Sequence, residues 1–224
     1  MRNGVSNKTP SGWCRHFRSC SEETEREQPE ERLAMGHEDS HSKTFVYVLI
    51  RDYLTFALGE SGSVPAANSV AKTLRKACSF VQGSRKQELE LCIEKLNVAS
   101  VEQAQRALPI LIGEVYSDGT DNWGRLVTVY AFCGVLARHL RSKDIAEEEL
   151  VEGIAQCVAQ HTWTHKAAWI KENGGWEKGF VEYFQPNSPG FVDYFQQESP
   201  RFSYAKIAAI TGIVAAFSFV MYQH

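Results

Sequence analysis

The chain has 224 residues, 43% of them apolar and 23% charged, which is long enough for one compact domain with a core and tails. Its 24 basic residues nearly balance its 27 acidic ones, so no polybasic surface for nucleic acid is expected. A mean hydropathy of −0.31 excludes a polytopic membrane protein. Six Cys without a C-x-x-C pair indicate neither a zinc ribbon nor a disulfide scaffold, and we expect a reducing compartment.

Residues 1–43 are predicted to be a disordered N-terminal extension. Residues 21–32 read SEETEREQPEER, with six Glu and no apolar side chain. Such a segment buries too little apolar surface to offset the entropy of ordering. No continuous apolar run precedes it, so no secretory signal is expected. The MGHEDS stretch at Met35 fits a myristoylation signal only if translation starts there.

Between residues 44 and 184 the apolar residues recur at helical rather than alternating spacing. Ser100 three residues before Gln103, and Asp144 three before Glu147, predict helix N-caps. Turn signals that should end helices lie at residues 59–65, 83, 97, 118–119, 142–144 and 173–175. This range is therefore predicted to be one all-helical domain.

One predicted helix differs from the others because residues 126–137, LVTVYAFCGVLA, carry no charge. A segment that is apolar on nearly every face either spans a membrane or is wrapped by other helices, and its length favours the buried helix. The predicted fold class is all-α, a helical bundle in which amphipathic helices wrap this central apolar helix.

The last segment, residues 201–224, is predicted to be a C-terminal membrane anchor, joined to the domain by a linker over residues 185–200. Residues 207–222, IAAITGIVAAFSFVMY, are uncharged. As a helix they would span about 24 Å, against a hydrocarbon core of about 30 Å, and Lys206 can extend the span by snorkelling. The alternative is a final core helix folded onto the domain.

A short repeat lies between the domain and this segment. GFVEYFQ at residues 179–185 recurs as GFVDYFQ at residues 190–196. It is either a duplication that lengthens the linker or a second apolar segment that covers an exposed surface of the domain.

Residues 122–125, NWGR, should form the first turn of the central helix, where unpaired backbone N–H groups and the helix dipole favour an anion. Gly124 allows close approach of another backbone, and Arg125 offers a fork of donors suited to a carboxylate. An amphipathic helix that carries one acidic residue requires such a site. The alternative is an internal salt bridge from Arg125 to Asp118 or Asp52.

The first of two long motifs contains these residues: it is DGTDNWGRLVTVYAFCGVLARHL at 118–140, and the second is WIKENGGWEKGFVEYF at 169–184. They resemble the first and second homology regions of the Bcl-2 apoptosis-regulator family. FVYVLIRDYL at 45–54 looks like the fourth region and VAKTLRKACSFVQ at 70–82 like the third. The NGGWE wording, LNVASVE at 96–102 and Cys92 are most similar to A1/Bfl-type pro-survival members, with the myeloid-cell-leukaemia type second.

The resemblance implies a pro-survival regulator whose hydrophobic groove sequesters the amphipathic death-motif helix of pro-apoptotic relatives and so inhibits mitochondrial outer-membrane permeabilisation. Arg125 would pair with an Asp of the ligand, Asn122 would hydrogen-bond near it, and Gly124 would let the ligand pack closely. Cys92 would lie near the groove, and its reactivity is a minor hypothesis. The candidates for apolar pockets, chosen from periodicity, are Val81, Leu89, Leu108, Ile112, Val127 and Phe132.

The same resemblance implies a cytosol-facing protein that is anchored in the mitochondrial outer membrane and partly cytoplasmic. The endoplasmic reticulum and the nuclear envelope are alternative membranes, and homo- or heterodimerisation is left open.

Two departures from the family pattern matter. The third region usually reads Leu, three residues, Gly or Ala, then Asp, whereas here Leu74 is followed by Cys78 and Ser79. A pore-forming effector must insert this helix into a sibling, so the missing carboxylate favours a receptor, and a pore-forming pro-apoptotic effector of the same fold stays the alternative. Secondly, Pro109 is expected to kink the helix before the NWGR turn, because it removes a backbone hydrogen bond.

No enzyme, cofactor or metal site is predicted. His161 and His165 are four residues apart, but the HTWTH sequence lacks the Glu of the H-E-x-x-H motif. We interpret the two histidines as a surface or internally satisfied pair. No Gly-rich phosphate loop, nucleophile elbow or carboxylate pair stands out.

Overall fold

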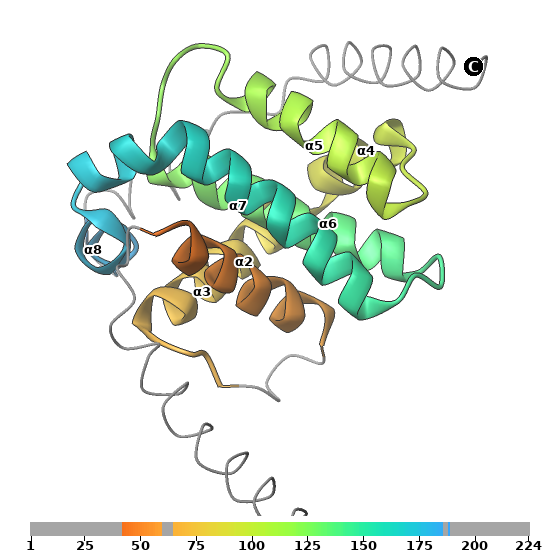
Figure 1. Cartoon of the computed structure of the whole chain (residues 1–224), viewed down its shortest axis with the longest axis horizontal. Coiled ribbons are helices and arrows are strands. Elements are labelled where there is room, and N and C mark those ends of the chain that lie inside the picture. Colours follow the sequence, from red (N-terminus) through yellow and green to blue (C-terminus); the bar gives the residue numbers. More distant parts are fainter. Residues whose placement is uncertain (1–41, 60–64, 186–187, 189–224) are drawn as a thin grey trace, which may run out of the picture. The chain divides into compact units, whose positions relative to one another are not determined.

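The computed structural model describes residues 42–59, 65–185 and 188 (Figure 1). Its elements are α2 (Lys43–Leu58), α3 (Ser69–Ser84), α4 (Lys86–Leu96), α5 (Val101–Val115), α6 (Trp123–Arg141), α7 (Glu147–Glu172), the π-helix η1 (Gly175–Phe180) and the short α8 (Val181–Tyr183). No strand occurs within the described ranges, so the all-helical prediction is confirmed there. Residues 1–41 of the predicted extension over 1–43, the second repeat copy and the anchor lie outside the described residues, whereas Ser42 and Lys43 already belong to the start of α2.

The central helix of the bundle is α6, as predicted from its uncharged run. It contacts α2, α3, α4, α5 and α7, and every residue from Trp123 to Gly134 is buried. In Figure 1, α6 runs beside α7, with α2 and α3 on one side of the pair and α4 and α5 on the other. Within the described ranges, no helix combines the length and the hydropathy that crossing a membrane requires.

A glycine in α6 explains how closely α2 and α3 approach it. A Cβ added at Gly134 would overlap the Tyr53 hydroxyl and the Gln82 amide. The Gln82 Nε2 donates to the Tyr53 hydroxyl and to the Ala131 carbonyl, both at 2.8 Å. The missing side chain therefore makes room for a buried polar contact that joins three helices.

One of the two predicted N-caps is confirmed. The Ser100 hydroxyl accepts from the Gln103 N–H at 3.3 Å at the start of α5. The Asp144 prediction is wrong, because α7 begins after Ala146, which provides no side-chain cap. Asp144 instead adopts a left-handed conformation with φ 62°, and its N–H donates to the Arg141 carbonyl in the turn that ends α6.

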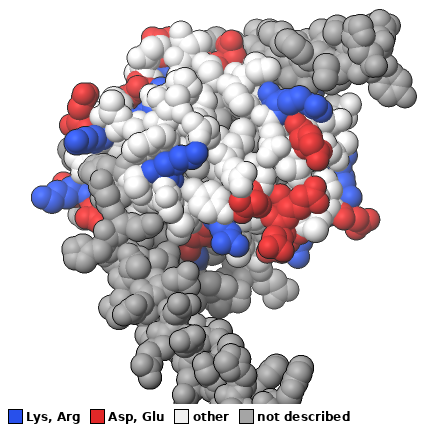
Figure 2. Space-filling view, in the orientation of Figure 1, with Lys and Arg blue, Asp and Glu red and all other residues white. Residues whose placement is uncertain are grey.

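Negative charge takes the place of a cap at the start of α7. Its first turn carries three consecutive glutamates, Glu147, Glu148 and Glu149, and carboxylates are favourable at the positive end of a helix dipole. Figure 2 shows acidic side chains gathered over this end of the molecule.

Pro109 lies inside α5 without ending it. Because Pro109 has no N–H, the Gln105 carbonyl loses its usual partner four residues later. The Cys157 thiol of α7 donates to that carbonyl with a distance of 3.6 Å between sulfur and oxygen. A side chain from a neighbouring helix thus replaces the missing backbone bond, and the expected kink stays a prediction.

Candidate functional site

The NWGR turn begins α6, and its spacing follows from helix capping. Asn122 is extended, with φ −156°, and its Oδ1 accepts from the Arg125 N–H at 2.8 Å. An Asn at the N-cap satisfies a backbone donor that a helix start leaves unpaired. Asn122 therefore sets the start of α6 and, three residues later, the place of Arg125.

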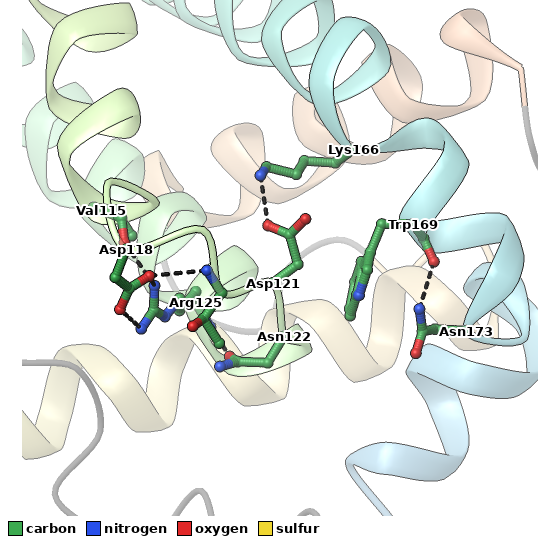
Figure 3. A network of polar contacts seen from close by, with 9 residues as sticks. Val115, Asp118, Asp121, Asn122, Arg125, Lys166, Trp169 and Asn173 are labelled. Carbon is green, nitrogen blue, oxygen red and sulfur yellow. Dashed lines mark hydrogen bonds and ion pairs between the residues drawn. The ribbon is translucent and has the colours of Figure 1, made fainter.

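The Arg125 guanidinium is held by a carboxylate of the same chain, as Figure 3 shows. Its Nη2 donates to Asp118 Oδ2 at 2.6 Å, and its Nη1 donates to Asp118 Oδ1 and, at 3.0 Å, to the Val115 carbonyl. The Arg125 side chain is 9% exposed and that of Asp118 is 54% exposed. Arg125 also holds the pKa of the Asp118 carboxyl well below its usual range.

The internal salt bridge considered from the sequence is thus present, and its partner is Asp118 rather than Asp52. Asp52 pairs with Arg75 instead, at 2.7 and 2.9 Å, between α2 and α3. The pairing of Arg125 with a carboxylate of a ligand stays a prediction. The structure nevertheless demonstrates that the end of this side chain binds a carboxylate with both nitrogens of its fork.

A second charged pair lies beside the first. Lys166 of α7 donates to Asp121 at 2.5 Å, and its ammonium lies 3.7 Å from the centre of the Tyr116 ring. The Tyr116 hydroxyl and the Arg125 Nε are buried and have no hydrogen-bond partner among the described atoms. Burial, together with the charge of Asp121, raises the pKa of Tyr116.

The apolar pocket candidates are all inside the core. They come from α3, α4, α5 and α6 and belong to one hydrophobic cluster, with exposed fractions of 2% or less. Gly124 is buried as well. Periodicity identified the inward faces of these helices, but the structure brings the residues together as core rather than as the lining of an open groove. Their contact with a ligand stays a prediction; the residues are Val81, Leu89, Cys92, Leu108, Ile112, Val127 and Phe132.

Sequence periodicity also missed the large apolar side chains at the surface. Phe80 of α3 is 45% exposed, Leu91 of α4 is 38% exposed and Trp163 of α7 is 38% exposed. Phe80 and Leu91 each directly adjoin a predicted pocket residue in the sequence, Val81 and Cys92. Nothing in the spacing marks them, because they lie off the buried stripe of their helices.

Cys92 is not an activated thiol in this structure. Burial, with a smaller contribution from Glu88, raises its pKa to about 11. Since the thiolate is the nucleophile, a pKa this high leaves little reactive form at neutral pH. Cys92 is therefore better described as a small apolar core residue than as a reactive group.

An aromatic cluster joins the two long motifs, and site reasoning from the sequence missed it. The Trp123 ring lies 4.8 Å from that of Trp169, 5.6 Å from that of Trp176 and 5.4 Å from that of Phe180. The sequence feature that could have revealed this cluster is the presence of Trp in both motifs. Because Trp176 and Phe180 are at most 1% exposed, the cluster fixes the start of α6 against the end of α7.

A pocket of about 770 Å³ opens at this end of the bundle. It shares only Asn122 with the predicted groove residues, so it is a different site. Acidic, amide and aromatic groups line it: Asp121, Asn122, Trp123, Trp169, Asn173, Gly179, Glu182, Tyr183, Gln185 and Ser188.

Comparisons with known proteins agree with this architecture. The family model described as apoptosis regulator proteins of the Bcl-2 family matches residues 74–176. The Bcl-2-related protein A1 of Bos taurus is 36% identical over 147 residues, which are 64% of this chain and 83% of that protein. The anti-apoptotic protein NR13 of Coturnix japonica is 28% identical over 137 residues, 61% of this chain and 74% of that protein.

Solved structures give the same result. The zebrafish pro-survival protein NRZ in complex with the Bad BH3 matches with a TM-score of 0.54 and 28% identity, over 64% of this chain and 94% of that one. The same protein in its apo form matches with a TM-score of 0.54 and 30% identity, over 63% and 92%. The fold is Bcl-2-like, the predicted resemblance to A1-type members is confirmed, and the chain belongs to the Bcl-2 family of apoptosis regulators.

Proposed function

We propose that this protein is a pro-survival regulator that binds the amphipathic death-motif helix of pro-apoptotic Bcl-2 relatives, without enzymatic chemistry. Its relatives support this, since one is named an anti-apoptotic protein and another is a pro-survival protein solved with a BH3 segment. The observation that carries the proposal is the carboxylate bound to the fork of Arg125. The Asp of a death-motif helix would bind the same pair of guanidinium nitrogens.

Exchange of one carboxylate for another is feasible because of where Asp118 lies. Asp118 is in the segment between α5 and α6 and is half exposed, so water can solvate it once it leaves Arg125. Arg125 keeps its bond to the Val115 carbonyl, which holds the guanidinium in place. The arriving carboxylate therefore meets an oriented donor pair.

The receptor is favoured over the pore-forming effector by α3. Leu74 and Cys78 are buried, whereas Ser79, which stands where the family pattern has Asp, is exposed and uncharged. Without that carboxylate, α3 is a poor ligand for the Arg of a sibling. Dye release from liposomes by the purified protein alone would contradict the receptor and support the effector.

The direct test is a fluorescence-polarisation titration of death-motif peptides against the wild-type protein and Arg125→Ala. The substitution should weaken binding by roughly 2 to 5 kcal/mol, because the bound peptide would bury its carboxylate against Arg125 and the substitution removes that partner. A peptide whose Asp is replaced by Asn should lose affinity for the wild type and little for the variant. Equal affinities of both proteins for the acidic peptide would refute the role of Arg125.

The membrane part of the proposal rests on sequence. A domain over residues 44–184 would be held at the cytosolic face of the mitochondrial outer membrane, or of the endoplasmic reticulum, by residues 201–224, which contain a sixteen-residue uncharged run over 207–222. Deleting residues 201–224 should move the protein from the membrane fraction to the soluble fraction. An unchanged membrane fraction would contradict the anchor.

A further inference from the structure

The heptapeptide repeat has one copy within the described residues. GFVEYFQ, residues 179–185, ends η1 and forms α8, and GFVDYFQ, residues 190–196, lies outside the described range. In the first copy Phe180 is fully buried and Phe184 is 6% exposed. This first copy packs against Trp123, Trp176 and the Asn173–Gly175 turn. We call the place that it occupies the heptapeptide seat.

The seat makes strict demands on its occupant. A Cβ added at Gly179 would overlap the Asn173 carbonyl, while the Gly179 N–H donates to the Gly174 carbonyl at 3.0 Å. The next residue, Phe180, places its ring 5.4 Å from Trp123 and 5.3 Å from Trp176. Only a segment with Gly, followed by aromatic rings at the required spacing, fits there.

The second copy meets these demands position by position. It has Gly190 for the crowded glycine and Phe191 and Phe195 for the two buried rings. The two copies differ at one position, Glu182 against Asp193, and Glu182 is exposed in the seat. Every side chain that the seat buries is therefore present in both copies.

We propose that residues 190–196 are an alternative occupant of the heptapeptide seat, so that the two copies compete for one place in the fold. With the second copy seated, residues 177–189 would form a connecting loop after Trp176. A longer loop adds little entropic cost, because that cost grows only slowly with loop length. The shift would shorten the tether between the domain and residues 197–224 by eleven residues.

The residue before each copy makes the first copy the preferred occupant. Lys178 lies inside η1, whereas the equivalent residue of the second copy is Pro189, which has no N–H to donate in a hydrogen-bonded helix. The second copy is thus a reserve that takes the seat when the first is weakened or pulled away. Competition for the heptapeptide seat is independent of the proposed function, and its test measures no ligand binding.

The test uses the full chain in detergent micelles and compares Phe180→Ala with and without an intact second copy. Hydrogen exchange followed by mass spectrometry should show residues 190–196 gaining at least about tenfold protection in Phe180→Ala. Phe191→Ala alone should leave the unfolding midpoint unchanged. Combining the two substitutions should lower the midpoint by more than the sum of the single effects.

Gly190→Ala is the sharpest control, because it keeps both phenylalanines and adds only the Cβ for which the seat has no room. In the Phe180→Ala background, Gly190→Ala should remove the protection of residues 190–196 and lower the unfolding midpoint further. Asp193→Glu in the same background should change neither. The proposal would be overturned if Phe180→Ala and the double variant Phe180→Ala with Gly190→Ala had the same unfolding midpoint and residues 190–196 gained no protection in Phe180→Ala. If Phe180→Ala does not fold, the milder pair Phe184→Ala and Phe195→Ala decides by the same criteria.

Discussion

The Asp118 carboxylate should compete with a ligand for Arg125, so removing its charge should strengthen ligand binding. Asp118→Asn replaces two charge-assisted hydrogen bonds, from Nη1 and Nη2, by at best one weaker bond. The bond from Arg125 to the Val115 carbonyl is unaffected. The guanidinium should therefore remain oriented but become available to an arriving carboxylate.

The size of the effect follows from the exposure of the pair. Ion pairs with an exposed partner shift an equilibrium by about 1.5- to 5-fold, and the Asp118 side chain is 54% exposed. The apparent affinity for a ligand is the intrinsic affinity multiplied by the fraction of protein that is competent to bind, here the fraction in which Asp118 has left Arg125. Asp118→Asn should thus lower the apparent Kd for a death-motif peptide by about 1.5- to 5-fold.

The assay is a polarisation titration at low salt with one acidic peptide. Asp144→Asn is the matched control, because it removes one carboxylate from the turn after α6 and Asn tolerates the left-handed conformation there. Since Arg125 holds the pKa of Asp118 well below its usual range, Asp118 stays ionised, and the gain should be the same at pH 5.5 and pH 8. Weaker peptide binding by Asp118→Asn would refute the competition and show that Asp118 helps to form the site.

Two further predictions concern stability. Gly134→Val should lower the free energy of unfolding by about 2 kcal/mol or more, because the added side chain overlaps the buried contact between Tyr53 and Gln82. Gly113→Ala should raise that free energy by about 0.5 to 1 kcal/mol, because the space around Gly113 is open and Ala favours a helix. Urea titrations of the two variants and the wild type measure both effects. Burial first, then neighbouring positive charge, lowers the pKa of His161 to about 4, so the unfolded chain binds a proton that the folded protein does not. Stability should therefore fall by roughly 1 to 2 kcal/mol as the pH drops from about 6.5 to about 4, and His161→Gln should flatten that slope; an unchanged slope would contradict the assignment.

Much of the fold was predictable from local sequence. The periodicity between residues 44 and 184 predicts helices, and the uncharged run over 126–137 predicts that one of them is surrounded. Both predictions agree with α6, which packs against α2, α3, α4, α5 and α7. The N-cap at Asp144 was wrong because the same residue types favour turns and caps, and only the path of the chain after α6 distinguishes the two.

The site was predictable in part. The NWGR motif located Arg125 at the start of the central helix, whereas the structure revealed that Asn122 caps that helix by accepting from the Arg125 N–H three residues later. Periodicity located the inward side chains of α3 to α6, but it does not distinguish core from groove, since both lie on the apolar stripe. The exposed Phe80 and Leu91 lie outside that stripe.

The sequence by itself determined the helices, the central position of α6 and the presence of an arginine at its start, because these depend on residues within a few turns of one another. The tertiary structure decided which carboxylate holds Arg125, which thiol replaces the bond lost at Pro109, and why Gly179 must be a glycine. Each of these depends on groups that approach from another element or turn. Distances between such groups are set by the packing of the whole bundle, and no local pattern specifies them.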